Sequence, residues 1–77
     1  LSPADVVKAL DRAAANAGFD TVVTAPARRS AYGGPVIWMF ERTGTFDGVT
    51  VHLGANEVDD GDGAYVLVDM SVDVSPA

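Results

Sequence analysis

The hydrophobic pattern of this chain changes once, near Gly18, and that change limits the folds open to it. Before Gly18, apolar residues recur at the spacing of an α-helix. After it, the apolar residues fall into short runs or alternate with polar ones, as they do in β-strands. One helical segment followed only by strand segments predicts an α+β fold, with the helix packed on a sheet.

The helix has clear start and stop signals. Ser2 is a suitable N-cap, Pro3 suits the first helical position, and Asp5 suits the positive end of the helix dipole. Gly18 fits a left-handed C-terminal cap, so we expect a helix over residues 3–17. The expected inner face of this helix consists of Val6, Leu10, Ala13, Ala14 and Ala17.

Four strand segments follow the helix. They span residues 20–27, 36–40, 49–53 and 66–74, joined by loops at 28–35, 43–48 and 54–63. Pro26 lacks a backbone N–H and places the first strand at an edge of the sheet. The last strand has the longest alternation and is expected to be central. We therefore predict one small domain over residues 1–77, a helix on a four-stranded antiparallel meander (α-β-β-β-β).

Composition narrows the functional classes. The chain has no cysteine, which excludes disulfides, thiolate metal sites and a cysteine nucleophile. Eleven acidic residues against five basic ones give a net charge of −6, which disfavours nucleic acid and anionic membranes as partners. No apolar stretch is long enough to insert into a membrane. The chain begins with Leu1, and we expect a trimmed or mature fragment, an exported or lipoprotein domain being one interpretation.

No combination of residues indicates catalysis, a cofactor or a metal ion. The acidic segment from Asp59 to Gly63 resembles part of a calcium loop, but the twelfth position counted from Asp60 is Ser71 instead of glutamate. His52 is the only histidine, and zinc sites normally take three or four protein ligands. We therefore expect no enzyme, no metal site and no cofactor.

One loop has unusual content. Arg28, Arg29 and Tyr32 precede the Gly33-Gly34 pair, and two guanidinium groups beside exposed backbone can hold a carboxylate or a phosphate. A solvated connection that uses glycines for turning explains the same residues. This loop is the predicted position of any polar recognition site.

The strands contain more apolar residues than one buried face needs. Pairing Phe40 with Val49 and Trp38 with Val51 leaves the alternate residues on the outer sheet face, away from the helix. The expected outer patch consists of Ile37, Met39, Tyr65 and Leu67 around His52. A contiguous patch of this kind marks an interface, whereas scattered apolar residues are ordinary surface.

The expected function is a non-enzymatic interaction module that binds a protein partner, or itself as a homo-oligomer, through the outer sheet face or an edge strand. The alternative is a small acidic accessory or inhibitor protein that engages a basic protein surface. No motif indicates a family, and the sequence specifies neither the compartment nor the partner.

Overall fold

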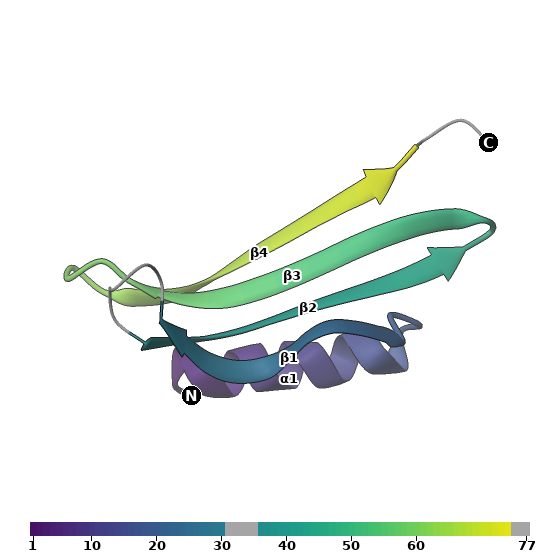
Figure 1. Ribbon diagram of the computed structural model, residues 1–77. Helices are drawn as coiled ribbons and strands as arrows, with labels where there is room; N and C mark the ends of the chain where they lie inside the picture. Colours follow the sequence, from purple (N-terminus) through teal and green to yellow (C-terminus); the bar gives the residue numbers. More distant parts are fainter. Residues whose placement is uncertain (31–35, 75–77) are drawn as a thin grey trace.

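A computed structural model describes residues 1–30 and 36–74 of the chain (Figure 1). Its elements are the helix α1 (Pro3–Asn16) and the strands β1 (Thr21–Ser30), β2 (Val36–Phe46), β3 (Val49–Asp59) and β4 (Ala64–Asp73). The strands form one antiparallel sheet in the order β1-β2-β3-β4, and α1 packs on one face of it. The predicted α+β meander is confirmed.

Both ends of α1 follow the sequence signals. The Ser2 side chain accepts a hydrogen bond from the backbone N–H of Asp5, at 3.2 Å, and its hydroxyl donates to the Asp5 carboxylate, at 2.9 Å. These bonds hold the pKa of Asp5 below its ordinary value. Gly18 has a φ of 107°, in a region that glycine adopts more easily than any other residue, and the chain leaves the helix there.

The buried core lies between the helix and the two middle strands. Val7 and Ala14 of α1 pack against Phe40 of β2 and Ala55 of β3. Val7 has no exposed surface, although the expected inner face included Val6 in its place. Val6 and Leu10 are half-buried, and Ala13 and Ala17 are exposed. The helix is therefore rotated about its axis from the predicted orientation, so that Val7 faces the sheet.

The hairpin between β2 and β3 is tighter than expected. Asp47 and Gly48 have φ values of 50° and 80°, typical of a two-residue type I′ turn, and Phe46 pairs with Val49. Residues 43–46 therefore belong to β2 instead of a loop. Phe40 pairs with Ala55, so the predicted pairing of Phe40 with Val49 is wrong by six residues along β3. An even shift leaves each side chain on its predicted face.

Strand β3 continues through Asp59, where a loop was expected from residue 54. In the turn that follows, the carboxylates of Asp59 and Asp60 accept hydrogen bonds from the backbone N–H groups of Gly61 and Asp62, both at 3.0 Å. Among the strands that the structure describes, β4 pairs only with β3 and lies at an edge of the sheet. The prediction that the last strand is central is therefore wrong.

A partly buried ion pair joins helix and sheet. Arg42 of β2 donates from Nε to Asp11 Oδ1 of α1 at 2.5 Å and from Nη1 to the Phe19 carbonyl at 3.0 Å. The hydrogen bond with Asp11 raises the pKa of Arg42. These bonds hold α1 against β2.

Candidate interaction surface

The strand register assigns each residue of the sheet to one of two faces. The pair Phe40 and Ala55 packs under the helix, and Val68 is the partner of Ala55 on β4. Because side chains alternate along a strand, Met70 and Val72 share this helix side with Val68. The opposite face is called the outer face below.

The helix leaves the helix side of β4 largely uncovered. A helix about 10 Å wide covers about two strands that lie 4.8 Å apart. Helix α1 packs mainly over β2 and β3, and Figure 1 shows β4 at the opposite side of the sheet from β1. Val68, Met70 and Val72 are accordingly 53%, 62% and 49% exposed. Three adjoining apolar side chains on one edge therefore face solvent.

An apolar groove of about 230 Å³ lies beside these residues. The end of α1 forms one wall with Leu10 and Ala17, the sheet forms the floor with Leu53 and Ala55, and Val68 lies on the β4 side. The groove connects the half-covered core to the exposed strand.

The two edges of the sheet differ in how they resist pairing with another strand. Edge strand β1 contains Pro26, carries the exposed pair Arg28 and Arg29 near its end, and has two register shifts against β2. Proline, charge and irregular register are the usual means by which a protein blocks an edge. Edge strand β4 runs for ten residues in unbroken register with β3 and contains neither proline nor a basic residue. Within residues 1–30 and 36–74, no strand pairs with its outer edge, and that edge has the regular geometry that a further strand needs.

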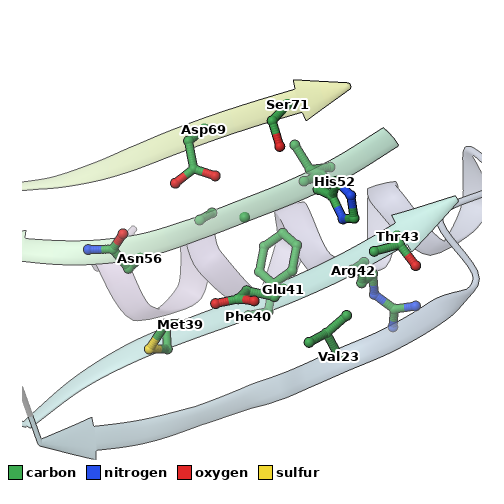
Figure 2. Close-up of a pocket in the computed structure, with 13 residues that line it drawn as sticks. Val23, Met39, Phe40, Glu41, Arg42, Thr43, His52, Asn56, Asp69 and Ser71 are labelled. Carbon is green, nitrogen blue, oxygen red and sulfur yellow. The ribbon is translucent and has the colours of Figure 1, made fainter. Parts of the chain in front are cut away.

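A second hollow, of about 440 Å³, lies mainly on the outer face, and Figure 2 shows the side chains around it. Its floor includes Gly54, with Glu41 of β2 and Asp69 of β4 as the partners of that glycine on either side. A Cβ atom added to Gly54 would lie 3.1 Å from Asp69 Oδ1. The Asp69 carboxylate therefore leans inward over the glycine, beside the hollow.

The predicted outer patch is placed as follows. Met39 and Leu67 both align with Asn56 across the sheet, and Tyr65 aligns with Val58. His52 aligns instead with Thr43 and Ser71, four residues along β3 from Asn56. The corrected register therefore removes His52 from the middle of the patch. Ile37 and Met39 are half-buried, while Tyr65 and Leu67 on β4 are 48% and 52% exposed.

The first residues of the predicted polar loop belong to a strand. Arg28 and Arg29 belong to β1, where they pair with Trp38 and Ile37 and therefore lie on opposite faces of the sheet. The two guanidinium groups do not share one site there. Tyr32, the third residue of that prediction, lies outside the described residues.

The described parts of the chain hold no group of three or more histidines, cysteines or acids arranged for a metal ion. Across the same residues, no helix has both the length and the apolar character needed to span a membrane.

Comparisons with protein-family models, with curated proteins and with solved structures found no match to this chain. The functional argument therefore rests on the surfaces described above.

Proposed function

We propose that this chain is a non-enzymatic interaction module that accepts an extended segment of a partner protein along the free edge of β4. The observation that carries the proposal is the concentration of exposed apolar side chains on this strand. Five of them lie on β4, divided between its two faces: Tyr65, Leu67, Val68, Met70 and Val72. An added strand would cover both sets at once, because its own side chains alternate between the two faces.

The backbone of β4 supplies the second part of the interaction. An edge strand presents a row of N–H and C=O groups that are not paired within the sheet, and strand addition uses them for affinity. The regular pairing of β4 with β3 keeps this row in the geometry of a sheet. The partner therefore needs an extended conformation, but it needs no fold of its own.

The side chains alone are too weak to hold a partner. Fully burying a valine or methionine contributes about 1.5 to 3 kcal/mol, so covering the exposed half of Val68, Met70 and Val72 contributes about 2 to 4.5 kcal/mol. Association costs at least about 4 kcal/mol in lost freedom of motion. Backbone pairing and the apolar groove therefore have to contribute to binding as well.

The test uses ten-residue peptides, matched to the length of β4, that alternate valine with threonine, arginine or glutamate. Amide hydrogen exchange, followed by NMR, reports which strand becomes protected. At least one alternating peptide is expected to slow exchange along β4 and leave β1 unchanged. Met70→Lys places a charge on the helix side of the open edge and should abolish this protection.

Val22→Lys is the matched control, because Val22 lies on the other edge strand and is 48% exposed. It should leave the protection of β4 intact. The proposal is contradicted if no alternating peptide protects β4 in a chain that also remains monomeric. It is equally contradicted if Val22→Lys and Met70→Lys reduce binding alike.

A further inference from the structure

We infer that the segment received by β4 is basic on one face: an added strand with apolar residues opposite the helix side of β4 and an arginine opposite Asp69. This inference rests on the proposed function and adds the chemistry of the partner. It is argued from the charge of the outer face and from the absence of cations on β4.

The helix side of β4 determines which residues the added strand needs on one of its faces. Residues directly opposite one another in an antiparallel pair lie on the same face of the sheet. The positions opposite Val68, Met70 and Val72 therefore meet exposed apolar surface and the edge of the groove lined by Leu10 and Leu53. A charged side chain at those positions would lose water without gaining a partner. Apolar residues are required there.

The outer face of the sheet determines which residue the added strand needs on its other face. Glu41, Gly54 and Asp69 are aligned across three neighbouring strands, with a hollow over the glycine between the two acids (Figure 2). Because the missing Cβ of Gly54 leaves room, the Asp69 carboxylate lies at the rim of this hollow. A cation opposite Asp69 on a fifth strand would lie on the same face of the sheet as that carboxylate and would pair with it. Arginine fits best, because its planar guanidinium can hydrogen-bond a carboxylate through two N–H groups.

A second copy of this chain fits the edge less well. Strand β4 carries Asp69 and Asp73 and contains no lysine or arginine. Pairing β4 with β4 of another copy would gather four carboxylates at one seam and supply no cation from either strand. The net charge of −6 on each copy opposes the same approach. Strand β1 of another copy has cations at Arg28 and Arg29, but its register shifts and Pro26 interrupt pairing.

The experiment compares the three alternating peptides with a shuffled peptide that has the composition of the valine–arginine one, using calorimetry on the full chain. The valine–arginine peptide should bind about tenfold more tightly than the valine–threonine peptide, as expected for one charge-assisted pair. The valine–glutamate and shuffled peptides should bind most weakly. In Asp69→Asn the advantage of arginine over threonine should fall to about twofold or less.

Asp62→Asn is the matched control, because it removes the same charge from the exposed turn before β4. It should keep the arginine advantage.

Each contrary result has a distinct meaning. Equal binding of the arginine and threonine peptides, with β4 protected, overturns the charge inference and leaves the proposed function standing. An arginine advantage that persists in Asp69→Asn, or a shuffled peptide that binds as well, shows general attraction to an acidic chain and overturns the inference. A concentration-dependent dimer or filament that protects β4 shows that a second copy is the occupant, which also overturns it.

Discussion

Substituting Val7 with alanine tests the position of the core directly. The substitution removes two methyl groups from a side chain with no exposed surface. Removing one buried methylene costs about 0.5 to 1.5 kcal/mol, so removing two groups should cost about 1 to 3 kcal/mol. Alanine recovers about 0.5 kcal/mol through its higher helix propensity. The free energy of unfolding should therefore fall by about 0.5 to 2.5 kcal/mol, from the roughly 4 to 12 kcal/mol expected for 77 residues.

Val6→Ala is the matched control, since it makes the same chemical change at the neighbouring, half-buried position. Its loss of burial is smaller and its gain in helix propensity is the same, so its effect should be near zero. In thermal unfolding, a loss of about 1.5 kcal/mol lowers the melting temperature by about 6 to 12 °C in a domain of this size. A larger effect for Val6→Ala than for Val7→Ala would refute the observed orientation of the helix.

Two further predictions concern the attachment and the start of the helix. Asp11→Ala should lower the free energy of unfolding by about 1.5 to 3 kcal/mol, because it removes a charge-assisted bond to Arg42. A double-mutant cycle with Arg42→Ala, measured by denaturant unfolding, gives the coupling energy between the two side chains. A coupling energy near zero would show that the ion pair does not stabilise the fold. Ser2→Ala should return the pKa of Asp5 toward its ordinary value of 3.8, as measured by NMR titration. Because the pKa of Asp5 is lowered in the folded state, its contribution to stability is present above the ordinary pKa and is lost as the pH falls through the folded pKa. In Ser2→Ala this pH-dependent contribution should disappear. An unchanged Asp5 titration would contradict the capping geometry.

The parts of the fold that local sequence determines could be predicted. Ser2 and Gly18 form caps through bonds and dihedral angles within a few residues, so the predicted helix ends one residue from the observed one. Alternation along residues 66–72 likewise assigned the faces of β4 correctly, because side-chain direction depends only on position along the strand. A meander follows from short connections between neighbouring strands.

The extent of β2 and β3 could not be predicted from apolar residues alone. Thr43, Gly44 and Thr45 have no apolar pattern, and Gly54 is a poor strand former, yet all four are paired in the sheet. Cooperative pairing with neighbouring strands overrides their local preferences. One signal was present in the sequence: Asp47-Gly48 between apolar residues is typical of a two-residue hairpin. A two-residue turn at Asp47-Gly48 pairs Phe46 with Val49, which is the observed register of β2 and β3.

The candidate surface was missed for a different reason. Apolar residues that alternate along a strand predict one buried face, which would place Val68 and Met70 in the core beneath the helix. Their exposure depends on strand order and on the width of a helix relative to four strands, and neither quantity appears in the local pattern. The outward direction of Leu67 was predicted, but its neighbour on β3 was not, since that neighbour depends on the register.

The charged residues on the two edge strands affect both self-association and the proposed choice of partner. An open, apolar edge would also favour pairing between copies, and β1 avoids this with Pro26, Arg28 and Arg29. Strand β4 lacks those features, but the Asp69 carboxylate on its outer face would repel the same carboxylate of a second β4 and, in the proposed interaction, would pair with a cation of the partner. The same carboxylate would therefore discourage self-association and select a partner. Replacing it with asparagine should make the chain self-associate more readily and distinguish less between arginine and threonine peptides.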